Sequence, residues 1–153
     1  MNNPFKKAWE ELLGPLLRRP KRLQVAALCY KQAKGSDAKE ILLVTSRDTG
    51  RWIIPKGWPI DGKNAPEAAL QEAWEEAGVR KGTAGKALGH YNYDKELKNG
   101  LPVAVETLVF PVQVSEMKDD YPEAAQRSRK WVSPSEAANM VREPQLQEML
   151  RNL

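Results

Sequence analysis

Three glutamates crowd the end of one predicted helix. Glu72, Glu75 and Glu76 are three and four residues apart, so their carboxylates share one helix face. Like charges at this spacing repel each other, and the negative end of the helix dipole adds about 0.3–1 kcal/mol of repulsion per charge. No Lys or Arg lies within residues 64–77 to offset them. A hard divalent cation such as Mg²⁺ or Mn²⁺ would do so, since these ions prefer oxygen ligands. A solvated acidic helix face is the alternative.

The loop before this helix supplies groups suited to phosphate. The segment PKGWPIDG, residues 55–62, contains two prolines and two glycines, so its backbone carbonyls can approach a metal. Lys56 offers a point charge to a phosphate, and Arg47 and Arg51 lie just upstream with forked guanidinium groups that suit bidentate contacts. A Walker-type phosphate loop is excluded because Gly-Lys-Ser/Thr does not occur at its spacing. Loop and helix together predict a combined phosphate and metal site.

Apolar runs bounded by turn formers predict the elements that must position these residues. Strands are expected at residues 23–30, 41–46, 52–55, 87–94, 101–114 and 129–132. Helices are expected at residues 64–77, from Ser133 onward, and after Pro144. Pro111 suggests an edge strand or a bulge near the end of the strand that contains it. Because strands and helices do not alternate regularly, the order favours an α/β sandwich over a doubly wound parallel sheet.

Composition is that of one ordinary globular domain. The chain has 153 residues, of which 41% are hydrophobic and 29% charged, with a net charge of +4 that mildly favours polyanionic partners. No apolar stretch predicts a membrane span or a signal peptide, so we expect a cytoplasmic protein. The single cysteine, Cys29, excludes an internal disulfide and is expected to be buried. Residues 1–20 are expected to form an amphipathic helical extension that packs on the domain, with membrane-surface binding as the alternative.

The segment from Gly57 to Val79 resembles the Nudix box, the motif of the Nudix hydrolases. That box is Gly, five residues, Glu, seven residues, Arg-Glu, an aliphatic residue, one residue, Glu-Glu, one residue, Gly and an aliphatic residue, and its spacing is complete here. By resemblance, Glu72, Glu75 and Glu76 are metal ligands, with the backbone carbonyl of Gly57 as a further one. The resemblance implies an α/β/α sandwich with a mixed β-sheet and the box as a loop-helix-loop, in one domain over residues 1–153.

Two positions depart from the family pattern. Lys63 stands where the family has Glu, and Gln71 where it has Arg, so the family's ion pair between loop and helix is missing. The carboxylates of the box are intact, so we expect an active enzyme whose loop is braced differently. A catalytically silent, Nudix-like binding domain is the alternative. Glu67 could replace the missing glutamate, but its capping-box spacing to Asn64 favours a structural role.

The resemblance extends beyond the box to about residues 22–150. Residues 41–57 and 129–150 are similar to diphosphoinositol polyphosphate phosphohydrolases, and Pro-Lys-Gly is shared with asymmetrical diadenosine tetraphosphate hydrolases. These families imply hydrolysis of a phosphoanhydride in a nucleoside diphosphate linked to a group X, or in a polyphosphate, with Mg²⁺ or Mn²⁺. Arg47, Arg51 and Lys56 would bind the phosphorylated small-molecule substrate. Nucleic acid is expected only as RNA 5′ ends, and the oligomeric state is not indicated.

A general base is still needed for such a reaction. A carboxylate must accept the proton of the attacking water. The candidates are a glutamate of the helix or one from the loop at residues 115–128, where Glu123 is favoured over Glu116, because the family often supplies such a glutamate from a distal loop. His90, the single histidine, is expected to be structural, with a contact to the leaving group as the alternative.

Overall fold

The computed structural model describes residues 22–96 and 100–153, so the expected N-terminal helix lies outside the described residues. Its strands are β1 (Arg22–Gln32), β2 (Lys39–Thr45), β3 (Trp52–Ile53), β4 (Lys56–Gly57), β5 (Val79–Ala84), β6 (Gly89–Glu96), β7 (Pro102–Met117) and β8 (Arg129–Val132). Its helices are α2 (Ala65–Ala77), α3 (Pro134–Met140) and α4 (Pro144–Arg151). None of the helices in the described ranges is long and apolar enough to cross a membrane.

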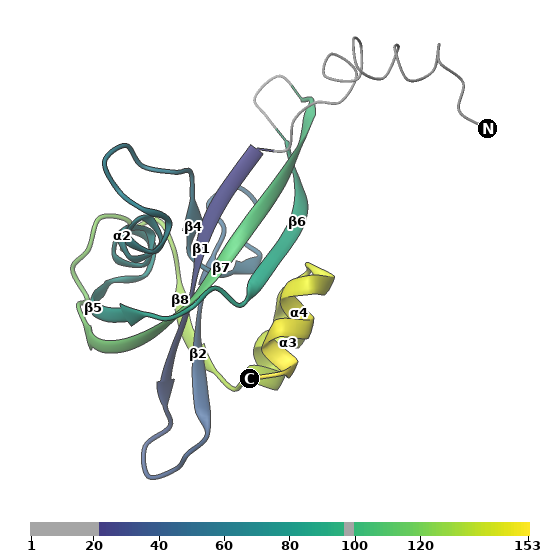
Figure 1. Cartoon of the computed structure of the whole chain (residues 1–153). Coiled ribbons are helices and arrows are strands. Elements are labelled where there is room, and N and C mark those ends of the chain that lie inside the picture. The colour runs from purple at the N-terminus through teal and green to yellow at the C-terminus, as the bar shows by residue number, and fades with distance from the viewer. Residues whose placement is uncertain (1–21, 97–99) are drawn as a thin grey trace, which may run out of the picture.

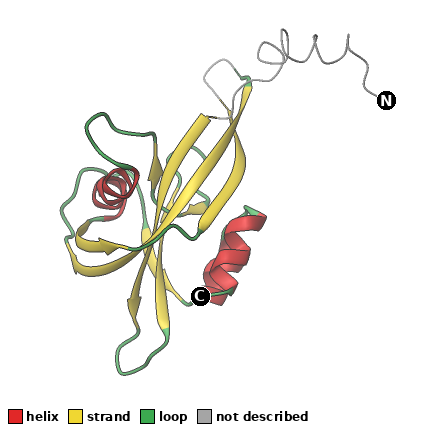
Figure 2. Ribbon diagram, in the orientation of Figure 1, coloured by secondary structure: helices red, strands yellow, loops and turns green. Residues whose placement is uncertain are grey.

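One sheet forms the middle layer of the domain. Helix α2 covers one face, and α3 and α4 cover the other (Figure 1). The eight-stranded sheet has the order β3-β2-β1-β7-β5, with β4 added on β1, β6 on β7 and β8 on β2. β1 and β7 run parallel from Arg22↔Val105 to Tyr30↔Gln113, whereas the other described pairs are antiparallel. Figure 2 shows the same helix-sheet-helix layering, which confirms the predicted sandwich with a mixed sheet.

Strand β1 shows why the sheet is central. Val25, Ala27 and Cys29 pack in the core on the α2 side, and Ala26 and Leu28 in the core on the α3 and α4 side. A strand covered on both faces needs an unbroken apolar run rather than an alternating one. Burial raises the pKa of the Cys29 thiol to about 12, so Cys29 is the buried hydrophobic residue that its sequence context predicts.

Two features of the sheet differ from the prediction. Strand β5, with the sequence VRKGTA, was not expected because it has a single large apolar residue, Val79. β7 is not an edge strand, since it pairs with β1, β5 and β6, but the alternative of a bulge near its end is met, because its register with β5 shifts between Lys81 and Gly82. Pro111 is tolerated there because pairing with β6 stops at Val109 and pairing with β5 begins at Val112. The proline thus lies where β7 changes partners and needs no amide donor.

Helix α2 begins and ends as the sequence predicts. Asn64 Oδ1 accepts from the Glu67 amide at 2.9 Å, and Glu67 Oε1 accepts from the Asn64 amide at 3.0 Å, which completes the capping box. Gly78 ends the helix in the left-handed region with φ 75°. The core-facing side of α2 consists mainly of small residues, Ala68, Ala69, Ala73 and Ala77. These let the helix lie close to the sheet, so its carboxylates come near the loop from β4.

Candidate active site

The three helix carboxylates line one polar cleft. Its volume is about 430 Å³, and it lies between the last turns of α2, the start of the Gly57 loop and the segment around Glu123. The charged side chains along it are Arg47, Asp48, Lys56, Glu72, Glu75, Glu76, Lys95, Glu123 and Arg127. The structure therefore brings together all but one of the predicted site residues, the exception being Arg51.

Gly57 and Glu72 fit against each other. The Glu72 carboxylate occupies the space that a side chain at position 57 would fill, since a Cβ there would lie 2.7 Å from Oε2 and closer still to Cδ and Oε1. Gly57 is held in place by β4, which pairs with β1 at Val25, and by the Ala27 amide, which donates to the Pro55 carbonyl at 2.9 Å. A glycine is required here for the close approach of a carboxylate rather than for an unusual backbone angle.

Glu76 is the most buried carboxylate of the cluster, with 6% of its surface exposed. Its Oε2 accepts from the Lys56 amide at 3.2 Å, and its Oε1 accepts from Arg127 Nη2 at 3.1 Å. Burial raises the pKa of Glu76, and the positive charge of Arg127 opposes that rise. Through its bond to the Lys56 amide, Glu76 connects α2 to the loop that is expected to bind phosphate.

Glu72 carries the least compensated charge. Its pKa is raised to about 8, first by burial and then by the charges of Glu76, Glu75 and Glu123. Glu75 accepts from Gln71 Nε2 at 2.9 Å, a neutral donor where the Nudix box has arginine. Neither Glu72 nor Glu75 forms an ion pair with another described residue.

The donor set of this cleft fits a hard divalent cation in its chemistry. Carboxylate oxygens are what Mg²⁺ and Mn²⁺ prefer, and a cation would relieve the repulsion that raises the pKa of Glu72. In the described parts of the chain, however, no group of three or more His, Cys, Asp or Glu side chains is arranged to hold a metal ion. Protein donors engage these oxygens: Arg127 bonds to Glu76 and Glu123, and Gln71 bonds to Glu75. The residue types therefore fit a divalent cation, but the carboxylate oxygens would have to release Arg127 and Gln71 in order to bind it.

Glu123 reaches the cleft from the segment between β7 and β8. Its amide donates to the Glu75 carbonyl at 3.0 Å, so it satisfies one of the free carbonyls in the last turn of α2. Its carboxylate lies 3.2 Å from Arg47 Nη1 and 3.2 Å from Arg127 Nη2. Glu116, the other loop candidate, lies in β7 opposite Lys81 and does not line the cleft. The geometry thus favours Glu123 over Glu116.

The three predicted phosphate-binding cations are placed differently from one another. Lys56 lines the cleft, its pKa lowered by burial, with Nζ 5.1 Å from the centre of the Tyr93 ring. Arg47 is also in the cleft, 55% exposed, and bonds to Gln126 at 3.0 Å as well as pairing with Glu123. Arg51 points elsewhere and forms an ion pair with buried Glu143 at 2.7 Å.

Sequence reasoning missed Arg127, Lys95 and Trp58, all of which line the cleft. Arg127 follows Glu123 by four residues, a spacing that would have suggested an ion pair had the segment been expected to turn. Lys95 lies 5.4 Å from the Trp58 ring centre, a contact between β6 and the Gly57 loop that carries no local sequence signal. Long-range contacts of this kind appear only once the sheet is assembled.

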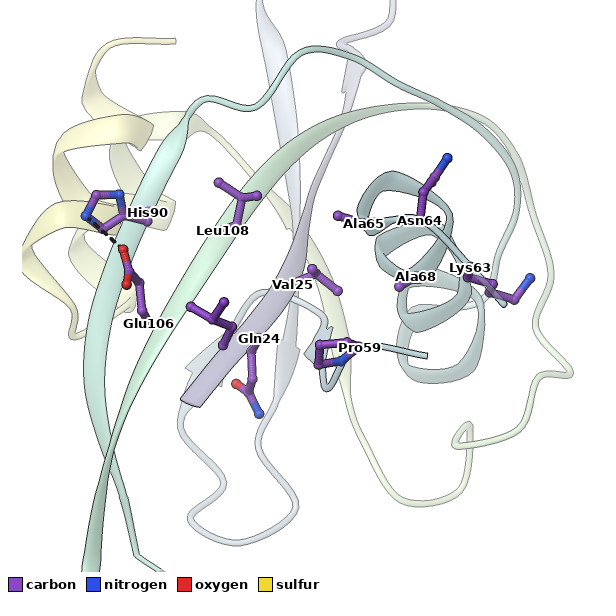
Figure 3. Close-up of a pocket in the computed structure, with 11 residues that line it drawn as sticks. Gln24, Val25, Pro59, Lys63, Asn64, Ala65, Ala68, His90, Glu106 and Leu108 are labelled. Carbon is purple, nitrogen blue, oxygen red and sulfur yellow. Dashed lines mark ion pairs between the residues drawn. The ribbon is translucent and has the colours of Figure 1, made fainter. Parts of the chain in front are cut away.

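An apolar groove of about 310 Å³ lies beside the cleft, near the start of α2, and shares Gln24 with it (Figure 3). It is lined by Val25, Leu108 and Ala65 among others, with Lys63 on its rim. His90 lies there too, 3.4 Å from Glu106, and does not line the polar cleft. The structural role expected of His90 and the alternative contact with a leaving group both stay predictions.

The loop is braced without the ion pair of the family. No ion pair of Lys63 with another residue in the described ranges is present. Instead its amide donates to the Ile60 carbonyl at 3.1 Å, closing a turn, and Ile60 packs against the core on the α2 side. The capping box at Asn64 then fixes where the loop becomes helix.

Comparison with known proteins agrees with this geometry. The family model described as NUDIX domain matches residues 20–153. Nudix hydrolase 21, chloroplastic, of Arabidopsis thaliana is 36% identical over 123 residues, which cover 79% of this chain and 59% of that protein. The chain thus spans about three fifths of that relative. Diphosphoinositol polyphosphate phosphohydrolase 3-alpha of Mus musculus is 31% identical over 121 residues, covering 77% of this chain and 68% of that one.

Solved structures share the fold. The crystal structure of the C. elegans Ap4A hydrolase superposes with a TM-score of 0.64 at 20% identity, covering 86% of this chain and 94% of that one. At 20% sequence identity the match shows only that the two proteins share a fold. Because the family model spans all of the described residues and the named relatives include Nudix hydrolases, the resemblance of the box is confirmed and the chain belongs to the Nudix hydrolase family.

Proposed function

We propose that this domain hydrolyses a phosphoanhydride bond in a nucleoside diphosphate linked to a group X, or in a related polyphosphate, with a divalent cation. The observation that carries the proposal is the convergence of Glu72, Glu75, Glu76 and Glu123 in a cleft that also contains Lys56 and Arg47. Acidic oxygens for a metal and basic groups for phosphates within one cleft are what this chemistry requires.

Glu72, Glu75 and Glu76 would hold the cation, with the Gly57 carbonyl as a further ligand. A bound Mg²⁺ or Mn²⁺ supplies charge neutralisation at phosphate oxygens and a lowered pKa of bound water. The fit of the Glu72 carboxylate against Gly57 supports the joint use of loop and helix.

The chain's own residues would orient the reactants and move the proton. Lys56 and Arg47 bind phosphates that do not react, and the cleft orients the bridging oxygen as the leaving group. Water attacks one phosphorus, the bridging P–O bond breaks, and the proton of the water passes to a carboxylate. Glu123 is favoured as that base because it faces the cluster from a separate segment, so it need not also hold the metal.

Diadenosine polyphosphates and diphosphoinositol polyphosphates are the proposed substrate types. The relatives named as diphosphoinositol polyphosphate phosphohydrolases support the second type, and the several cations of the cleft suit either. Lys95 and Trp58 line the cleft and would contact the part of such a substrate that lies away from the reacting phosphates. A location in the cytoplasm also remains a prediction, because Arabidopsis relatives are named as chloroplastic and mitochondrial.

A screen of phosphorylated substrates separates this function from two alternatives. A silent binding domain, suggested by Lys63 and Gln71, would bind polyphosphates without turnover. An RNA-end pyrophosphohydrolase would release pyrophosphate from 5′-triphosphorylated RNA at the same site.

The test is a screen of diadenosine polyphosphates, diphosphoinositol polyphosphates and triphosphorylated RNA with Mg²⁺, Mn²⁺ or EDTA. We expect turnover of at least one substrate with metal and none with EDTA. The Glu76→Gln variant should lose it, since the carboxylate that meets loop, helix and Arg127 becomes neutral. Equal activity of that variant and the wild type would overturn the proposed site.

A further inference from the structure

One guanidinium joins two carboxylates that come from different segments. Arg127 Nη2 lies 3.1 Å from Glu76 Oε1 and 3.2 Å from Glu123 Oε1, and the Arg127 side chain is 6% exposed. Its Nη1 donates to the Thr45 carbonyl at 3.0 Å. Its Nε is buried and has no hydrogen-bond partner. Nη1 thus fixes the side chain to the sheet, and Nη2 lies between the two carboxylates.

Arg127 Nη2 thus carries positive charge at the place where the carboxylates would bind a metal cation. Two carboxylates that share a single nitrogen at about 3 Å would repel each other if that positive charge were removed. Buried charge-assisted bonds are among the stronger ones in proteins, and breaking one partner leaves a buried charge uncompensated. The guanidinium therefore stabilises an oxygen of Glu76 that a divalent cation would use.

We propose that Arg127 is a positioning residue that bridges Glu76 and Glu123 in the metal-free protein, and that a divalent cation binds Glu76 in competition with its guanidinium. The inference rests on the proposed function, because it takes Glu76 as a metal ligand and Glu123 as the base. The bond to Thr45 does not involve Nη2, so the guanidinium can give up the carboxylates while it stays anchored to the sheet. Metal loading then also frees Glu123 from Arg127, while Arg47 still pairs with it.

The test is the affinity for Mn²⁺ alone, measured from the electron paramagnetic resonance signal of the free ion with the full chain. Arg127→Met removes the competing cation, so we expect Mn²⁺ to bind about tenfold more tightly than to the wild type. The thermal midpoint of the metal-free variant should fall, and saturating Mn²⁺ should raise it more than it raises that of the wild type.

Two further variants keep the interpretation unambiguous. Arg127→Lys retains the charge but lacks the fork that reaches Thr45 and the carboxylates together, so competition predicts an affinity between those of Arg127→Met and the wild type. A simple field effect of the charge predicts wild-type affinity for Arg127→Lys and would overturn the proposal. Arg129→Met is the matched control, because Arg129 bonds to the Ala77 and Lys118 carbonyls in the same region but to no carboxylate of the cluster. It should lower the thermal midpoint and leave Mn²⁺ affinity unchanged.

The outcomes separate this inference from the function on which it rests. If the wild type binds no Mn²⁺, the proposed metal site itself fails. If the wild type binds Mn²⁺ and Arg127→Met binds it equally well or more weakly, only the competition fails. Should Arg127→Met not fold, Arg127→Lys carries the same comparison.

Discussion

Substituting Gly57 by alanine would separate the catalytic geometry from the stability of the fold. A Cβ at this position would lie 2.7 Å from Glu72 Oε2 and closer to the other carboxyl atoms, whereas real Cβ contacts essentially never fall below 3.0 Å. The Glu72 carboxylate must therefore move away by several tenths of an ångström or more. Because Mg²⁺ requires nearly ideal octahedral geometry, with ligands at about 2.0–2.1 Å, such a shift should spoil the site.

Gly57→Ala should have a large effect on the rate and a small effect on the stability of the fold. Displacing a reacting or metal-holding group by about 1 Å can cost on the order of 100-fold in rate, which corresponds to about 2.7 kcal/mol of transition-state stabilisation. Gly57 is not among the glycines with positive φ, so alanine fits its backbone and should stabilise the fold by about 0.4–1 kcal/mol through the unfolded state. Glu72 ends in a flexible side chain that can give way, so we expect the free energy of unfolding to change by less than about 1 kcal/mol.

The assay compares kcat/KM for a substrate found in the screen with the denaturant midpoint of the same protein. Gly57→Ala should lose about 100-fold in kcat/KM at a nearly unchanged midpoint. Gly85→Ala is the matched control, because Gly85 also lacks a positive φ and its Cβ would meet Pro111 far from the cleft. Full activity and unchanged Mn²⁺ affinity in Gly57→Ala would refute the fit of Glu72 against this glycine as a requirement of the site.

Three further predictions follow from the charges. Lys56→Met should raise KM by about 10- to 100-fold, measured by steady-state kinetics, because it removes a charged contact to phosphate. Arg51→Met should leave KM near that of the wild type but lower the free energy of unfolding by about 3 kcal/mol, since buried Glu143 loses its partner; a raised KM at unchanged stability would restore Arg51 as a phosphate ligand. The pKa of Glu72 is raised from 4.5 to about 8, so its proton favours the folded state; the stabilisation is full below about pH 4.5 and is lost as the pH rises toward 8. Metal-free unfolding midpoints should therefore fall over this window, and saturating Mg²⁺ should weaken the fall, because metal binding displaces the proton.

The sequence predicted the parts of the site that lie close together in the chain. Glu72, Glu75 and Glu76 share a face because of helical spacing alone, and the capping box and Gly78 fix where that helix starts and stops. The loop with Lys56 and Gly57 is next to it in the chain, so its place in the cleft follows as well. Local geometry of this kind needs no knowledge of the sheet.

The remaining parts depend on contacts between distant segments. Arg127 compensates carboxylates that seem uncompensated on α2 alone, and Arg129 bonds to the Ala77 carbonyl near the negative end of that helix. Arg51 carries the same type of charge as Arg47 but is directed to Glu143, next to α4. Residue type and spacing cannot distinguish such partners, since Arg127 reaches the cleft only because β8 pairs with β2 and Arg127 bonds to the Thr45 carbonyl.

Phosphorus NMR in ¹⁸O-labelled water would test the central claim, that the carboxylates of α2 form a metal-dependent hydrolytic site, most directly. With Mg²⁺ and a diadenosine or diphosphoinositol polyphosphate, we predict new phosphate resonances, with the ¹⁸O isotope shift in one product only, and EDTA should prevent both. Binding of these substrates with Mg²⁺ or Mn²⁺ present but without any new resonance would contradict the claim and identify a silent Nudix domain.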